Sequence, residues 1–123
     1  MGRTNRKGNM VKNNHYRPHC GDIINLSFDP QAGHEQKGYR PALVISNDTL
    51  NQHSTMAFVC PITNTNRKHP FHIELNEQTK TTGVILCDQA KMLDVDARQA
   101  KFIEKAPQGI VADVVGLVKH FMP

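Results

Sequence analysis

One short segment of the sequence concentrates side chains that could do chemistry. Residues 33–41 read GHEQKGYRP and hold a histidine, a carboxylate, an amide, a lysine and an arginine. Cutting RNA without a metal ion needs a base for the 2′-hydroxyl, a donor for the charge that grows on the phosphate, and an acid for the leaving oxygen. His34 or Glu35 could be the base, and the guanidinium of Arg40 matches two phosphate oxygens. Thr63, farther along the chain, could add a hydroxyl donor.

The place of Arg40 in this segment sets it apart from an ordinary polar loop. It stands where the loop enters an apolar run, and Pro41 fixes the backbone just after it. We therefore expect the arginine to be partly buried and held in place. A solvent-exposed polar hairpin is the alternative interpretation of the same composition.

The elements that must position these side chains are mostly short strands. Alternation over residues 23–28 predicts a first strand, and the polar residues 29–39 predict a loop. Near the C-terminus, apolar residues recur with helical spacing from Ile110 to Phe121. We predict a mainly β fold, a small bent sheet or barrel with a C-terminal helix over its open side. Further strands are expected at residues 41–46, 55–62, 71–75 and 83–93 and around Phe102.

Composition bounds the class of protein. The chain has 123 residues, 38% hydrophobic and 21% charged, which fits one globular domain and excludes a disordered chain. No apolar run could span a bilayer and none stands at the N-terminus, so we expect no membrane association and a cytoplasmic location. Three scattered cysteines without a CxxC pair argue against disulfides and zinc; Cys60 and Cys87 are expected to pack in the interior.

The net charge of +4 resides in the N-terminal segment. The first fourteen residues carry Arg3, Arg6, Lys7 and Lys12 and no acid, whereas the remainder is neutral. Such a tail suits an anionic partner, but a solvated segment without a role is the favoured interpretation. We therefore divide the chain into a flexible basic tail, residues 1–19, and one domain, residues 20–123.

The loop belongs to a longer pattern with a known counterpart. The stretch GDIINLSFDPQAGHEQKGYRPALVIS resembles the N-terminal signature of the MazF/PemK/Kid family of ribonuclease toxins. The elements Pro61-Ile62-Thr63, Thr82-Gly83-Val84 and Cys87-Asp88-Gln89 resemble later family motifs, so the likeness runs from about Gly21 to Phe121. One departure is that Leu86 stands where the Kid branch has a catalytic arginine, which brings the chain closer to the MazF branch.

The resemblance implies a fold, an activity and partners. The fold would be an SH3-like β-barrel with a C-terminal helix, paired as a homodimer. The activity would be sequence-specific cleavage of single-stranded RNA, without a metal or other cofactor, to 2′,3′-cyclic phosphate and 5′-hydroxyl ends. The partner would be an acidic, MazE-like antitoxin that covers the RNA groove.

The resemblance also assigns roles to residues. Arg40 would be the main catalytic group, with Thr63 beside it on the phosphate; Glu35 and His34 match positions implicated in some members. Whether His34 or Glu35 is the base stays open, as do the cleavage sequence, the identity of the antitoxin and the role of the tail. RNA contacts are expected from Gln36, Lys37, Arg67, Lys68, Asp88, Gln89 and Lys91.

Other candidate residues receive structural interpretations. His69 and His72 flank Pro70 at a strand start and are expected on the surface. Phe71 could stack on a base, but its alternation with Ile73 favours a place in the core. Two other functions remain as alternatives: a gyrase-inhibiting toxin of the CcdB type, which shares the barrel but lacks this loop, and an RNA-binding module without catalysis.

Overall fold

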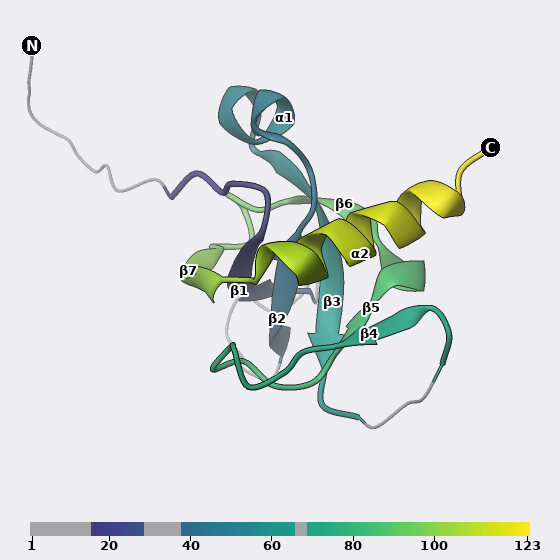
Figure 1. The fold of residues 1–123 in the computed structure, drawn as a ribbon. Coiled ribbons are helices and arrows are strands. Elements are labelled where there is room, and N and C mark those ends of the chain that lie inside the picture. The colour runs from purple at the N-terminus through teal and green to yellow at the C-terminus, as the bar shows by residue number, and fades with distance from the viewer. Residues whose placement is uncertain (1–15, 29–37, 66–68) are drawn as a thin grey trace, which may run out of the picture.

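The structure is a computed structural model that describes residues 16–28, 38–65 and 69–123, and these residues form seven strands and two α-helices (Figure 1). The strands are β1 (Asp22–Ser27), β2 (Tyr39–Val44), β3 (Met56–Thr63), β4 (His72–Glu74), β5 (Val84–Leu86), β6 (Lys91–Asp94) and β7 (Lys101–Lys105). The helices are α1 (Asp48–His53), the 3₁₀ helix η2 (Cys87–Gln89) and α2 (Gln108–His120). None of these helices is long and apolar enough to cross a membrane.

The strands form one antiparallel sheet that curls on itself. The hydrogen-bonded order is β4-β5-β3-β2-β1-β7, and β6 pairs with β3. The curl brings the ammonium of Lys91 on β6 to 5.5 Å from the centre of the Phe28 ring, which follows β1, although β3 and β2 lie between these strands in the sheet. The mainly β fold with a C-terminal helix is confirmed. Among the described residues no ladder joins β6 to β7, so the expected barrel is an open, strongly bent sheet.

Alternating side chains give the sheet two apolar faces. Ile23 and Leu43 point to one face and Ile24 and Val44 to the other, and all four are fully buried. We call the inner side of the curl the concave core. Its buried members are Ile24, Leu26, Ala42, Val44, Ala57, Val59, Leu93 and Val95.

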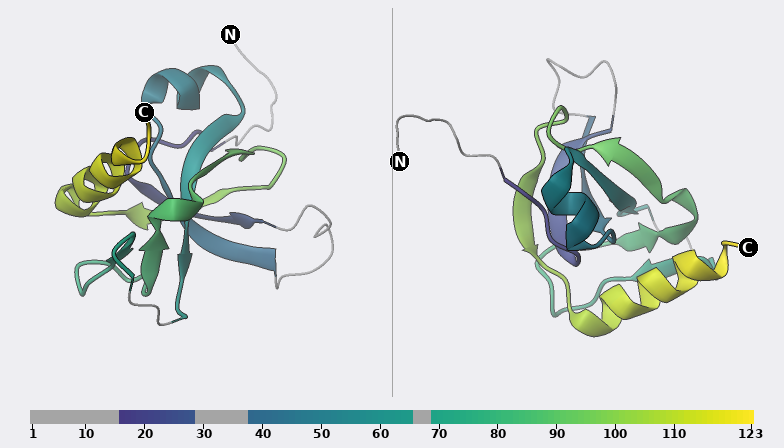
Figure 2. Two further views of the ribbon diagram at one scale, coloured as in Figure 1. Left: turned by 90° about the vertical axis from the view of Figure 1, so that its right-hand side faces the viewer. Right: turned by 90° about the horizontal axis from the view of Figure 1, so that it is seen from above.

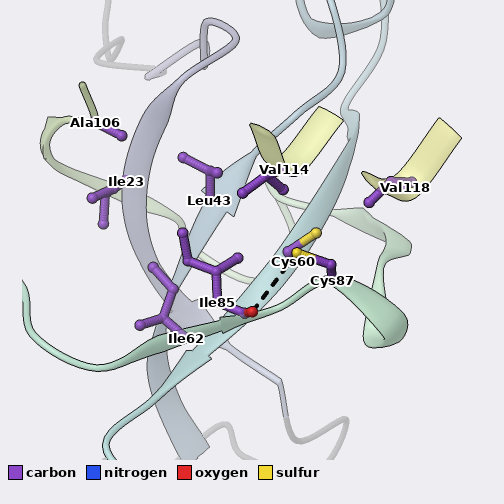
Figure 3. Close-up of a cluster of buried hydrophobic side chains, with 9 residues drawn as sticks. All are labelled: Ile23, Leu43, Cys60, Ile62, Ile85, Cys87, Ala106, Val114 and Val118. Atoms are coloured by element: carbon purple, nitrogen blue, oxygen red, sulfur yellow. Dashed lines mark hydrogen bonds between the residues drawn. The ribbon is translucent and has the colours of Figure 1, made fainter. Parts of the chain in front are cut away.

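Helix α2 covers the second face, as the helical spacing predicted (Figures 1 and 2). Val114 and Val118 are its buried residues, and they pack over Leu43 and Cys60 in the cluster that Figure 3 shows. Pro107 stands immediately before the helix, where its missing N–H costs nothing. Burial of Cys60 and Cys87 in this cluster confirms that these two cysteines pack in the interior.

The long strand expected over residues 83–93 is the main correction to the predicted elements. It is interrupted, because η2 separates β5 from β6. Ile62 pairs with Ile85 and Val59 pairs with Lys91, so the second segment carries three residues more than β3 does between these two pairs. The extra residues leave the ladder beside Pro61, which has no N–H to donate. The apolar run ends at Cys87, and the interruption falls at the polar residues Asp88 and Gln89 that follow it.

Two smaller expectations also differ. The strand expected at residues 41–46 begins at Tyr39, since Ser27 and Leu26 of β1 extend the pairing to Tyr39 and Arg40. Phe71, expected in the core, precedes β4 and is 39% exposed. Its ring instead meets that of Phe121 edge-on, with ring centres 4.9 Å apart.

Candidate active site

Two hydrogen-bonded strands carry the two predicted catalytic side chains. Ala42 of β2 pairs with Pro61 of β3, and Leu43 pairs with Cys60. The ladder ends at the Ala42–Pro61 pair, and Arg40 and Thr63 each stand two residues beyond it, at the same end of the two strands. Helix α1 connects the other ends of β2 and β3, which leaves this end free of it (Figure 1).

Both side chains belong to the face of the concave core. Arg40 alternates in phase with Ala42 and Val44, and Thr63 in phase with Val59, all of which bury their side chains there. Lys91 of β6, two residues before the buried Leu93, belongs to the same face and pairs with Val59. Around one end of the concave core stands a set that we call the rim, made of Phe28, Arg40, Thr63 and Lys91.

The exposure of Arg40 corrects an expectation. The residue is exposed rather than partly buried. It stands second in β2, two residues beyond the last pair of the ladder with β3, so side chains surround it on fewer sides than Val44. Within residues 16–28, 38–65 and 69–123 its guanidinium forms no ion pair. The charge is therefore open to an anionic ligand.

The backbone at Thr63 is fixed by its neighbours. Its hydroxyl oxygen accepts a hydrogen bond from the N–H of Thr65 at 3.1 Å, which leaves the hydroxyl proton to donate elsewhere. Gly83 passes so close that a Cβ placed on it would lie 2.4 Å from the carbonyl oxygen of Thr63. Its φ of +119° is also one that only glycine adopts readily. Thus the turn that ends at Gly83 packs against the backbone of Thr63 at the end of β3 and helps to fix the position of the Thr63 hydroxyl.

The second cation of the rim is oriented by an aromatic ring. The ammonium of Lys91 lies over the Phe28 ring at 5.5 Å from its centre, within the range of a cation–π contact. Phe28 continues β1, and its N–H donates to the carbonyl of Gly38 at 3.0 Å. The two cationic side chains thus sit at the same end of one face, an arrangement that can bind an extended polyanion.

The predicted contacts Asp88 and Gln89 owe their position to η2. Because this turn leaves the ladder, both residues are exposed. Cys87, the first residue of η2, is buried. Asp88 is not isolated. Its Oδ1 lies 3.3 Å from Nε2 of His72, whose side chain is only 6% exposed. The expectation that His72 is a surface residue is therefore wrong, since β4 pairs it with the buried Leu86.

The two thiols near this turn are buried. Hydrogen bonding to Cys87 and burial raise the pKa of the Cys60 thiol far above its usual value, and the hydrogen bond with Cys60 lowers the pKa of Cys87. The two sulfur atoms face one another in the cluster under α2 (Figure 3). Among the described residues, no group of three His, Cys, Asp or Glu side chains could hold a metal ion.

Several predicted site residues lie outside the described residues. His34, Glu35, Gln36 and Lys37 belong to segment 29–37, and Arg67 and Lys68 belong to segment 66–68. The described residues that border the two segments, however, stand at the rim end of β1, β2 and β3. Arg40, Thr63 and Lys91 are thus brought together on one face. Asp88 and Gln89 lie just before Lys91 in the chain.

Sequence comparison relates most of this chain to one group of proteins. The profile of the family described as "PemK-like, MazF-like toxin of type II toxin-antitoxin system" matches residues 19–122. Endoribonuclease PemK of Escherichia coli is 38% identical over 100 residues, which cover 78% of this chain and 75% of that protein. Endoribonuclease toxin ChpB of Escherichia coli K12 is 40% identical over 111 residues, covering 86% of this chain and 93% of ChpB.

Solved structures show the same relation in three dimensions. The crystal structure of MazF from Deinococcus radiodurans has a TM-score of 0.78 and 36% identity, and the match covers 88% of this chain and 98% of that one. A chain in the MazE-MazF crystal structure from the same organism has a TM-score of 0.78 at 34% identity, with 87% and 97% coverage. The sheet and helix described above therefore have close counterparts of nearly the same length.

Proposed function

The chain belongs to the PemK-like, MazF-like family of type II toxin–antitoxin toxins, and we propose that it is an endoribonuclease that cuts single-stranded messenger RNA at a specific sequence. Its similarity to proteins named endoribonucleases extends over most of their length. The observation that supports the proposal is that the exposed Arg40 and Thr63 stand at the same end of two paired strands, at positions that alternate onto one face.

The proposed reaction uses the RNA's own 2′-hydroxyl. A base removes its proton, the 2′-oxygen attacks phosphorus, and the bond to the 5′-oxygen breaks with proton transfer to that oxygen. The products are a 2′,3′-cyclic phosphate and a 5′-hydroxyl. Arg40 would neutralise the charge that builds up on the phosphate oxygens, and Thr63 would donate a hydrogen bond to one of them. His34 or Glu35 would supply the base, and no metal ion is needed for these steps.

The remaining predicted contacts would hold the strand. Lys91 extends the positive rim beyond Arg40, and Asp88 and Gln89 offer groups that hydrogen-bond to bases. We place Gln36, Lys37, Arg67 and Lys68 on the same path, in the segments that leave the rim end of the strands. A single strand fits because its unpaired bases expose their Watson–Crick edges, which are occupied by base pairing in a duplex.

We further propose a homodimer and an antitoxin partner. A chain similar to this one occurs in crystals of a MazE-MazF complex, which supports an antitoxin as partner. An acidic segment of such a partner would compete with RNA for Arg40 and Lys91. The cytoplasm is the expected location, since messenger RNA is found there.

The test is cleavage of a long RNA in EDTA by the wild-type chain and by Arg40→Ala, Arg40→Lys and Thr63→Val. We expect wild-type cleavage with cyclic phosphate ends, a loss of about 10²–10³-fold in kcat for Arg40→Ala, and a loss of about 10- to 100-fold for Thr63→Val. Arg17→Ala is the control, because this exposed arginine contacts the carbonyl of Ser54 at the α1 end. The arginine-to-lysine variant should recover little, since an ammonium cannot contact two phosphate oxygens in parallel.

Two outcomes would contradict the proposal. Full activity of folded Arg40→Ala would remove the assigned role. RNA that is bound by the wild type but stays intact would indicate an RNA-binding module, and inhibition of DNA gyrase supercoiling without RNA cleavage would indicate the gyrase-directed alternative.

A further inference from the structure

His72 is a buried imidazole with one polar contact to an exposed carboxylate. Its side chain is 6% exposed, and that of Asp88, in η2, is 38% exposed. Nε2 of His72 lies 3.3 Å from Oδ1 of Asp88. The histidine comes from β4 and the aspartate follows β5, so the contact ties η2 to the outer strand of the sheet. Neither the core nor the catalytic pair at Arg40 accounts for this arrangement.

The other ring nitrogen of His72 fixes which nitrogen carries the proton. Nδ1 is buried and has no hydrogen-bond partner among the described residues. A proton there would be a buried donor without an acceptor, which is unfavourable. The proton therefore belongs on Nε2, where it is donated to Asp88. The ring cannot turn away readily, because β4 pairs His72 with the buried Leu86 and the ring of His69 lies 5.0 Å from it, centre to centre.

The Asp88 carboxylate, three residues before Lys91 of the proposed RNA-binding rim, can bind only some of the groups in RNA. Asp88 can only accept hydrogen bonds and would repel phosphate oxygens. With Oδ1 engaged by His72, the accepting capacity of Oδ2 is left for a ligand. The groups in RNA that suit it are the exocyclic amines of bases, namely the 4-amino group of cytosine, the 6-amino group of adenine and the 2-amino group of guanine. Uracil presents a carbonyl oxygen at that edge, so it would be rejected.

We propose that His72 is a positioning residue that holds Asp88 as the acceptor for a base amine, and that the pair sets the enzyme's preference for a base with an exocyclic amine (cytosine, adenine or guanine) over uracil at one position of the RNA. This rests on the proposed endoribonuclease function. It goes beyond it by assigning base discrimination to a defined pair of residues, one of which the sequence placed on the surface.

The sharpest test exchanges the chemistry of the pair while keeping its shape. In Asp88→Asn, the N–H of His72 would hold the amide oxygen, so that the amide NH₂ faces the base. The preference should then invert towards uracil, whose 4-carbonyl oxygen can accept a hydrogen bond from that amide. We expect the ratio of kcat/KM values for matched oligonucleotides to change by at least about tenfold at a single position. Fragment-end sequencing of a long RNA would locate that position.

A second variant separates positioning from structure. His72→Leu fills a similar volume but cannot donate, so discrimination at the same position should weaken while the preferences at other positions remain. His72→Gln keeps an amide donor and should restore most of it. The double variant His72→Leu with Asp88→Asn should show no inversion, because nothing then orients the amide.

A second histidine–aspartate contact in this chain provides the control. Nδ1 of His19 lies 3.2 Å from Asp48, with both side chains more than half exposed and Asp48 in α1. His19→Leu and Asp48→Asn make the same chemical changes at the α1 end of the molecule. They should leave the base preference unchanged.

The wild-type protein gives a readout that needs no variant to fold. Long-range ¹H–¹⁵N NMR spectra should show the His72 tautomer with its proton on Nε2. A uniform loss of activity in His72→Leu with unchanged base preference, an unchanged preference in Asp88→Asn, or a proton on Nδ1 would each overturn the proposal. A wild-type chain that leaves RNA intact would overturn the endoribonuclease function and this proposal together, whereas normal cleavage with unaltered preference in the variants would overturn this one alone.

Discussion

Gly83→Ala tests whether the turn before β5 sets the position of Thr63. The added Cβ would meet the carbonyl oxygen of Thr63 at 2.4 Å and its carbonyl carbon at 2.9 Å, both far inside normal contact distances. These are backbone atoms, so the strand end itself has to move. The residue would also keep a φ of +119°, which alanine rarely adopts.

Both terms can be given a magnitude. Holding a residue in a region favoured only by glycine costs about 1–3 kcal/mol, and relieving an overlap in a packed site costs about another 1–3 kcal/mol. The free energy of unfolding should therefore fall by roughly 2–6 kcal/mol, a large part of the 5–15 kcal/mol typical of a domain. With a urea dependence of about 1–3 kcal/mol per molar, the unfolding midpoint should fall by about 1 M or more.

The matched control is the same substitution in α2. A Cβ on Gly116 would meet nothing within 4 Å, and alanine is favoured over glycine inside a helix by about 1 kcal/mol. Gly116→Ala should therefore stabilise the protein slightly. Under conditions in which both variants are folded, only Gly83→Ala should slow RNA cleavage, because only it displaces the Thr63 hydroxyl. Equal urea midpoints for the wild type and Gly83→Ala would refute the reasoning.

Two further predictions concern stability. Val114→Ala should lower the free energy of unfolding by about 2–3 kcal/mol, because this side chain is fully buried between α2 and the sheet; urea unfolding measures it, with the half-buried Val115→Ala as the smaller-effect control. Burial raises the pKa of the Glu104 carboxylate. Hydrogen bonds from Thr81 and from the N–H of Lys80 lower it and hold it below the usual 4.5. Stabilisation by a carboxylate of lowered pKa is complete above its unfolded value and disappears as the pH falls through the folded one. Hence Glu104→Gln should lower Tm near neutral pH and approach wild type by about pH 3; a Tm difference that is independent of pH would contradict this assignment.

The local pattern of the sequence was sufficient for most elements. Alternation in residues 23–28 predicted β1, and the helical spacing of Val114 and Val118 predicted α2. Both patterns can be recognised from residues that are close in the sequence, because a strand repeats every two residues and a helix about every 3.6. The neighbourhood of Arg40 and Thr63 was inferred only through family resemblance. No local pattern gives the register of two strands, which depends on how whole strands pair.

Where the sequence prediction failed, a non-local contact decided the outcome. Residues 83–93 were predicted as one strand, yet this segment has three residues more than β3 between their shared pairs, and the extra residues form η2 and leave Asp88 exposed. His72 looked like a surface residue beside Pro70, yet its pairing with Leu86 buries it. In each case the neighbour that determines the environment lies more than ten residues away.

The sequence by itself thus determined the types of element, the apolar faces of the strands and helix, and the set of side chains capable of RNA chemistry, since all of these follow from residue type and short-range periodicity. The tertiary structure alone decided that Arg40 is exposed, that Phe28 and Lys91 meet across the curl, and that His72 holds Asp88. The physical reason is that exposure and side-chain contact depend on sheet curvature and register, which arise from the packing of all the strands together.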